Sequence, residues 1–154
     1  MATLPNASRF RFGWLVVALA LGMPAIAVAA AKYVEVAVAA AILFDAPSDK
    51  ANKRFIVTEA TPLEVLSSLP PWTKVRDVDG SVNWIRAGEL RDAGHLLARS
   101  AATVRAAPAD TSPARFMVAR GVLLERLGQA RDGWIEVRHR GAAGFVRTEE
   151  VWGL

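Results

Sequence analysis

Apolar and polar residues alternate in short runs along most of this chain, and past residue 45 no run shows the period of an α-helix. Runs of about four to six residues recur with Gly, Pro, Asp or Asn between them, which is typical of short antiparallel strands joined by tight turns. The pattern predicts an all-β fold built from small antiparallel barrels.

The expected strands fall into two series of similar length. The first begins with one or two strands between residues 33 and 44, where Val and Ile favour a strand over a helix through the alanines. Each series ends in a single helical turn, at 87–90 and 148–151, and residues 91–101 connect the two. The remaining expected strands are 55–57, 63–66, 72–76, 82–85, 95–98, 102–105, 116–118, 122–127, 134–138 and 145–147.

The two series are copies of one pattern. Trp72-Thr73-Lys74-Val75-Arg76 returns as Trp134-Ile135-Glu136-Val137-Arg138, displaced by 62 positions. Most other matches are displaced by 61, and they include Ala46-Pro47 with Ala107-Pro108, Arg54-Phe55 with Arg115-Phe116 and Leu63-Glu64 with Leu124-Glu125. The difference between 61 and 62 means that the second copy has one inserted residue before Trp134. An internal repeat of this kind predicts one small module present twice. We assign residues 32–92 to the first module and 93–154 to the second, and expect modules this small to pack against each other or to share a sheet edge.

Residues 1–31 have a different character. Arg9 and Arg11 precede an uncharged apolar stretch at 13–31 that contains Pro24 and ends in small residues. This layout is typical of a secretory signal peptide, and an uncleaved transmembrane helix is the alternative. Either way the segment should contact the inner membrane at least during export, and the remainder should be periplasmic, free or anchored to the inner membrane and facing the periplasm.

Composition excludes several classes of function. The chain has no cysteine, so disulfides, thiolate metal sites and cysteine nucleophiles are ruled out. Two of its 19 Lys and Arg residues lie in the first 31 positions, which leaves 17 against 15 acidic residues in the rest. Nucleic-acid binding would need a denser basic surface with stacking aromatics, so no nucleic-acid partner is expected.

The repeated residues resemble the bacterial SH3-like domain in tandem, as found in exported bacterial proteins. In the second module the resemblance lies in Val104-Arg105-Ala106-Ala107-Pro108, Gly121, Leu124-Glu125, Gly133-Trp134-Ile135-Glu136-Val137 and Gly144-Phe145-Val146. The first module departs from it at Leu43-Phe44-Asp45, Ala60, Pro71 and Asn83. The resemblance implies SH3-like barrels that bind short peptides or the stem peptides of peptidoglycan, often beside a separate hydrolase domain.

Five residues are candidates for ligand binding: Trp72, Arg76, Trp134, Arg138 and Arg105. The two tryptophans open strands after loops, where an aromatic side chain lines a groove or packs the core. An arginine repeated at a matched place can grip a carboxylate through two parallel hydrogen bonds, or pair with a neighbouring Glu64 or Glu125. Arg105 stands at the family's Val-Arg position.

Catalysis, a metal site and a cofactor are not expected. The two histidines, His95 and His139, are far apart in sequence, and no serine lies in a Gly-x-Ser-x-Gly turn. The sequence therefore predicts a non-catalytic protein that recognises a cell-wall peptide or an extended protein segment in the cell envelope. Two alternatives remain: a structural adaptor that holds another envelope protein through a larger interface, and an unrecognised hydrolase.

Overall fold

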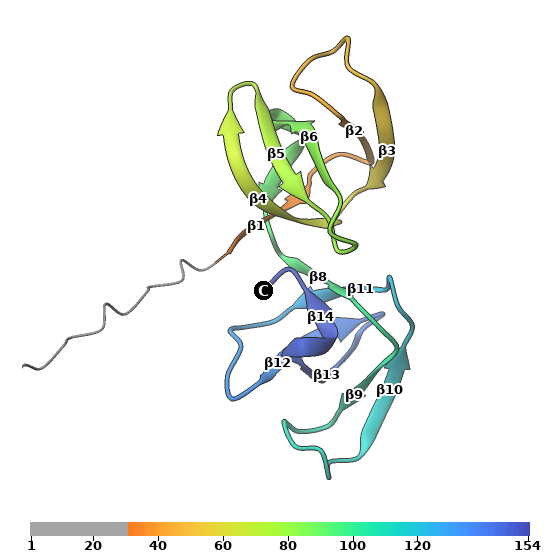
Figure 1. Ribbon diagram of the computed structural model, residues 1–154. Coiled ribbons are helices and arrows are strands. Elements are labelled where there is room, and N and C mark those ends of the chain that lie inside the picture. The colour runs from red at the N-terminus through yellow and green to blue at the C-terminus, as the bar shows by residue number, and fades with distance from the viewer. Residues whose placement is uncertain (1–30) are drawn as a thin grey trace, which may run out of the picture.

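The computed structural model describes residues 31–154 and contains two seven-stranded antiparallel sheets, one after the other along the chain (Figure 1). The first sheet consists of β1 (Lys32–Val36), β2 (Ala40–Phe44), β3 (Lys53–Thr58), β4 (Pro62–Leu69), β5 (Trp72–Arg76), β6 (Val82–Arg86) and β7 (Leu90–Asp92). The second consists of β8 (His95–Ala98), β9 (Ala102–Arg105), β10 (Ala114–Val118), β11 (Leu123–Arg126), β12 (Trp134–His139), β13 (Ala142–Arg147) and β14 (Val151–Trp152). The prediction of an all-β fold is confirmed.

The two sheets have the same strand order. The first runs β3-β2-β6-β5-β4-β1-β7 and the second β10-β9-β13-β12-β11-β8-β14, so each strand corresponds to the one seven places later. Each also has a single 3-10 turn before its last strand, at Ala87–Glu89 and Thr148–Glu150. The duplication seen in the sequence is therefore a duplication of topology, and we call the two copies the first and second modules.

The sheets are not closed into barrels, and the sequence-based prediction is wrong on this point. Within residues 31–154, the end strands β3 and β7 do not pair with each other, and neither do β10 and β14. The last strands, β7 and β14, have only three and two residues and pair with β1 and β8, so the sheets end there. Each module is an open sheet that encloses its own core.

Each core is small and apolar. In the first module it consists of Val34, Val36, Ala41, Leu43, Leu63, Val75 and Ile85. In the second it consists of Leu96, Ala98, Ala102, Val104, Val118, Leu124, Ile135, Val137, Val146 and Val151. Most of these residues alternate with more exposed neighbours along their strands, as expected for a sheet with one buried face.

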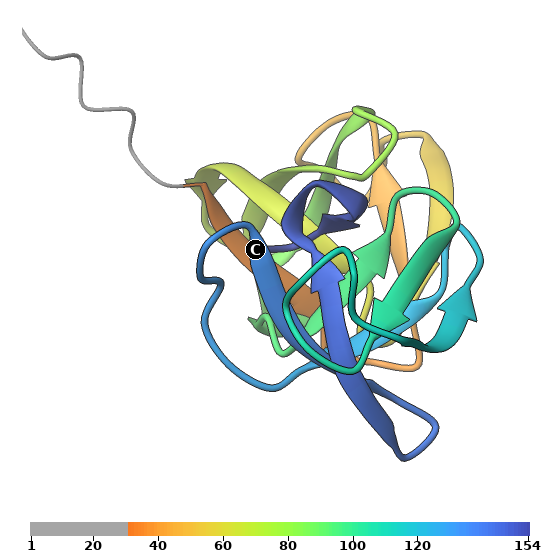
Figure 2. The same ribbon diagram turned by 90° about the horizontal axis from the view of Figure 1, so that it is seen from below.

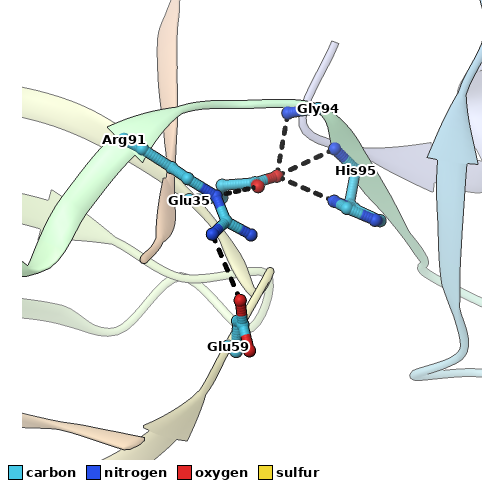
Figure 3. Close-up of polar contacts among 5 residues, drawn as sticks. All are labelled: Glu35, Glu59, Arg91, Gly94 and His95. Atoms are coloured by element: carbon cyan, nitrogen blue, oxygen red, sulfur yellow. Dashed lines mark hydrogen bonds and ion pairs between the residues drawn. The ribbon is translucent and has the colours of Figure 1, made fainter. Parts of the chain in front are cut away.

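The two modules meet around the buried carboxylate of Glu35, which is 2% exposed (Figure 3). Its Oε2 accepts hydrogen bonds from the backbone N–H groups of Gly94 and His95, at 2.8 and 2.9 Å, and lies 3.0 Å from His95 Nδ1. Its Oε1 accepts from Arg91 Nε at 2.7 Å, and Arg91 also donates to Glu59. One side chain of β1 thus fixes the segment that joins the two sheets.

The C-terminal residues close the same interface. Trp152 packs edge-on against Tyr33 with ring centroids 5.1 Å apart, and its Nε1 donates to the Pro62 carbonyl oxygen at 3.3 Å. Gly153 is buried, and a Cβ on it would lie 2.9 Å from Pro62 Cβ. Figures 1 and 2 both place this end of the chain beside β1. The expected packing of the two modules against each other is observed.

The predicted signal peptide or membrane anchor falls on residues 1–31, all but the last of which lie outside the described residues. Within residues 31–154, no helix has the length and apolar character needed to cross a bilayer.

We predict that Gly144→Ala destabilises the second module. A Cβ at Gly144 would lie 2.6 Å from the Arg105 carbonyl oxygen and 2.7 Å from Val104 Cγ1, so the β9–β13 contact would have to open. The expected loss is about 1–3 kcal/mol of unfolding free energy, measured by urea titration.

The matched control is Asn83→Ala in the first module, where the sequence repeat aligns Asn83 with Gly144. Asn83 is 4% exposed and its Nδ2 has no hydrogen-bond partner in the described part of the chain. Removing an unpaired amide offsets the packing lost with it, so the change should stay within about 1 kcal/mol. Equal losses for the two variants would contradict this account.

We also predict that Glu35 makes stability depend on pH. Burial raises the pKa of Glu35, but the hydrogen bonds from Arg91, Gly94 and His95 outweigh it and hold the pKa below its ordinary value of 4.5. A lowered folded-state pKa stabilises the fold fully above the unfolded value, and this contribution disappears as the pH falls from about 4.5 through the folded pKa.

Glu35→Gln should therefore lower the unfolding free energy at neutral pH by about 2–3 kcal/mol and flatten its decline below pH ~5. Urea titrations across the pH range measure both effects. Glu59→Gln is the control, because Glu59 is 55% exposed and shares only the Arg91 contact; it should change stability by less than about 1 kcal/mol. Parallel pH curves for wild type and Glu35→Gln would argue against this role.

Candidate functional site

The second module contains a groove of about 500 Å³ on the outer face of β12 and β13. Its floor is formed by Trp134, Glu136 and Phe145, and Glu136 and Phe145 are cross-strand partners. Pro108, from the loop after β9, lines it as well, and the loop between β11 and β12 supplies Gly128, Gln129, Arg131 and Asp132. We call this the Trp134 groove; it combines aromatic surface with charged groups of both signs.

The groove exists because the chain leaves the sheet early after β11. Strand β11 ends at Arg126 and its ladder to β12 has only two residue pairs, with Leu127 N–H donating to Glu136 O at 3.0 Å just beyond it. A loop then runs to Gly133, which has φ 78°, a conformation that glycine adopts without strain. Arg131 and Trp134 exchange two backbone hydrogen bonds of 2.8 Å, which hold the end of this loop beside the groove.

The first module builds the same region differently. Strand β4 continues to Leu69, which pairs with Trp72, so the chain stays in the sheet up to the turn at Pro70-Pro71. Lys74 occupies the position of Glu136, and its Nζ lies 5.7 Å from the ring centroid of Trp84, the counterpart of Phe145. The aromatic surface that is open in the Trp134 groove is therefore covered by a lysine side chain here.

A Trp–Arg–Asp cluster supports this region in both modules. In the second, Arg147 Cζ lies 4.3 Å from the Trp134 ring centroid, and the guanidinium binds both carboxylate oxygens of Asp110. In the first, Arg86 lies 5.0 Å from Trp72 and pairs with Asp49. Each cluster connects the last long strand of its sheet to the loop after the second strand, which in the second module is the loop that contains Pro108.

The structure separates the candidate residues that the sequence grouped together. Trp134 lines the groove but is only 6% exposed, so it presents one edge. Arg138 lines a different hollow of about 260 Å³, near His95, and pairs with Glu125 at 3.2 Å. The alternative that these arginines pair with strand neighbours is thus what the structure shows, since Arg76 also binds Glu64, at 3.0 Å.

The remaining two candidates have structural contacts of their own. Trp72 is 6% exposed and packs edge-on against Phe44 at 5.3 Å. Arg105 donates from Nη1 to the Ser112 carbonyl oxygen at 2.8 Å, which fixes the loop after β9. Neither lines the Trp134 groove.

Sequence reasoning missed most of the groove. Its signal was the one-residue insertion before Trp134, which marks a change in connection length between the two copies. The Asp partners of the Trp–Arg–Asp clusters were also visible as matched positions, Asp49 and Asp110. Within residues 31–154, no three or more His, Cys, Asp or Glu side chains converge as a metal site would require.

The chain belongs to the bacterial SH3 domain family. The sequence profile of this domain matches it twice, at residues 37–92 and 98–153, which is one match for each sheet. This confirms the tandem bacterial SH3 repeat inferred from the residues. No curated protein matches the sequence.

Three solved structures are similar in outline. They are NlpC2 and NlpC1 from Trichomonas vaginalis, with 12% and 14% sequence identity, and an NlpC/P60 family protein from Bacillus cereus, with 13%. Each has a TM-score of 0.38. The matches cover 80%, 79% and 79% of this chain and 48%, 45% and 56% of those chains, so this chain spans about half their length.

We predict that Arg147→Lys loosens the loop that borders the groove. A lysine keeps the charge but loses the two parallel hydrogen bonds to Asp110 and the planar stacking on Trp134. Because Arg147 is 34% exposed, the expected loss of unfolding free energy is about 1 kcal/mol. Backbone amides of residues 106–113 should exchange faster with solvent, as measured by hydrogen–deuterium exchange.

The matched control is Arg86→Lys in the first module. It should accelerate exchange in residues 45–52, which include Asp49, and leave residues 106–113 unchanged. Uniform acceleration in both modules would mean that the clusters act on global stability and not on their own loops.

Proposed function

We propose that this protein is a non-catalytic binding protein of the cell envelope that recognises a peptide-like ligand, such as a peptidoglycan stem peptide, in the Trp134 groove. The observation that supports the proposal most directly is the composition of the groove. Trp134, Phe145 and Pro108 offer apolar contact, while Arg131, Asp132 and Glu136 offer charges of both signs. A short peptide with free amino and carboxylate groups along an apolar backbone matches such a surface.

Two further observations support it. The family to which both modules belong consists of small domains for which the resemblance implies binding to peptides or cell-wall stems. The apolar stretch at 13–31, preceded by Arg9 and Arg11, favours export to the periplasm, where a cell-wall ligand would be met. In this proposal the groove binds its ligand through non-covalent contacts and catalyses no reaction.

The groove also explains why binding is proposed for one module. Glu136 and Phe145 are open in the second module, whereas their counterparts Lys74 and Trp84 lie against each other. The two modules would then have different tasks, with the second holding the ligand and the first supporting it through the Glu35 interface.

We predict that the full-length protein sediments with purified peptidoglycan and that changes in the groove weaken this. Phe145→Ala removes apolar contact at the groove floor and Glu136→Lys reverses its charge, so each should weaken binding at least about fivefold. The matched controls are Trp84→Ala and Lys74→Glu, which make the corresponding changes in the first module and should leave sedimentation unchanged. Circular dichroism confirms that each variant is folded.

Sedimentation unaffected by either groove variant would reject the Trp134 groove as the site. Absence of sedimentation for the wild type would reject the cell-wall ligand and favour the alternative function, a structural adaptor for another envelope protein. One observation favours that alternative: Met117 on strand β10 is 73% exposed, and large exposed apolar side chains are common at protein–protein contacts.

A further inference from the structure

An exposed apolar side chain stands at the same place on an end strand of each module. Ile56 on β3 is 74% exposed, and Met117, displaced by 61 positions on β10, is 73% exposed. Strands β3 and β10 are terminal in their sheets and lie at the periphery of the two modules (Figure 1). Exposed apolar end strands invite pairing with another strand unless charges or bulges prevent it.

Strand β3 has a free side. Within residues 31–154 it pairs only with β2, and this pairing is regular from Phe55 to Thr58 and irregular between Lys53 and Phe55, so alternate N–H and C=O groups of residues 55–58 point away from the sheet. Its side chains alternate: Val57 packs on the core and Phe55, 47% exposed, points the same way, while Ile56 points outward beside Ile42. A hollow of about 380 Å³ at this edge is lined by Ile42 and residues 53–56.

The sequence of β3 is complementary to itself. When two copies of a strand pair antiparallel across a two-fold axis, residues that lie opposite each other point to the same face of the sheet. The axis must then pass between a residue and its own copy, so only registers centred on a residue are allowed. Centring on Ile56 places the two Ile56 side chains opposite each other and Phe55 opposite Val57. The same register places Lys53 opposite Glu59, once on each side of the axis.

Neighbouring registers lack this match. Centring on Phe55 places Arg54 opposite Ile56, and centring on Val57 places Phe55 opposite Glu59. Both put a charged side chain against an exposed apolar one, so neither forms an ion pair across the contact. One register therefore satisfies both the apolar contacts and the charges.

We propose that two copies of this protein associate through β3, antiparallel and centred on Ile56, so that the two first modules form one continuous sheet. The two-fold symmetric contact buries Ile56 and Phe55 and pairs Lys53 with Glu59 of the partner subunit. It leaves the Trp134 groove of each copy in the second module, and it does not depend on the ligand proposed above.

Strand β10 lacks the features that favour self-pairing. Centring a β10 pair on Met117 places Ala114 opposite Arg120 and Arg115 opposite Ala119, so no ion pair forms across the contact, and Arg120 already pairs with Asp79 of its own chain. This difference makes Met117 a matched control for Ile56, because the two side chains are almost equally exposed.

Single cysteine variants of the full-length chain test the proposal. The protein has no cysteine, so Ile56→Cys and Met117→Cys each introduce one thiol. On the two-fold axis, the two thiols introduced by Ile56→Cys come close enough for a disulfide, which oxidation with copper phenanthroline would form. We expect a covalent dimer from Ile56→Cys at least about tenfold faster than from Met117→Cys at equal concentration.

Sedimentation equilibrium gives a second measurement that needs no crosslink. A one-strand interface lies at the weak end of specific contacts, so we expect dimerisation at roughly 10–100 μM. Ile56→Lys places two like charges on the axis and should weaken dimerisation at least about tenfold, an effect expected from like-charge contact, whereas Met117→Lys should not. Both positions are exposed, so both variants should keep the wild-type melting temperature.

Equal crosslinking of the two cysteine variants, or equal association of the two lysine variants, would overturn the proposal. So would a wild-type chain that stays monomeric at roughly 100 μM. If the Ile56→Cys variant crosslinks in cells to a different protein instead of to itself, the β3 edge belongs to that partner and the self-pairing is likewise wrong.

Discussion

The constraint on which the rest of this structure depends is the small core of each module. A sheet of short strands packs around seven buried apolar residues in the first module and ten in the second. Domains of about 60 residues bury a smaller fraction of their surface than larger ones, so each has little apolar burial to spare. Ion pairs and hydrogen bonds of polar side chains therefore help to fix the loops and the relative position of the two modules.

The arginines show how this is done. Arg76 and Arg138 tie β4 to β5 and β11 to β12, Arg86 and Arg147 cover tryptophans and hold the loops after β2 and β9, and Arg91 binds the buried Glu35. Each guanidinium contributes an apolar plane as well as charge, which lets it cover the edge of a small core and bind a carboxylate at once. The contacts of Arg76, Arg138, Arg86 and Arg147 recur at matched positions of the two modules, which indicates a structural role that was present before the copies diverged.

The two copies differ in a connection that contributes no residue to either core. The connection between the fourth and fifth strands lies outside both cores, so one inserted residue and two glycines could open the Trp134 groove in the second module without disturbing the sheet. In the first module the longer β4 and Lys74 close the equivalent surface. The first module instead contributes Glu35 to the interface and an end strand, β3, whose sequence is complementary to itself.

The sequence by itself determined the all-β class, the duplication and the family, because alternation of apolar residues and the repeated Trp-x-x-Val-Arg pattern depend only on local geometry and spacing. It also pointed to the pairing of Arg76 with Glu64 and of Arg138 with Glu125, since matched pairs recur at matched positions. Only the tertiary structure decided that Trp134 and Arg138 line separate hollows, that the sheets stay open, and that Glu35 becomes buried between modules. These outcomes depend on how the strands twist and on which loops meet across the fold. Glu35 and Gly94, for example, are about 60 residues apart in the sequence, and no local pattern predicts a contact over that separation.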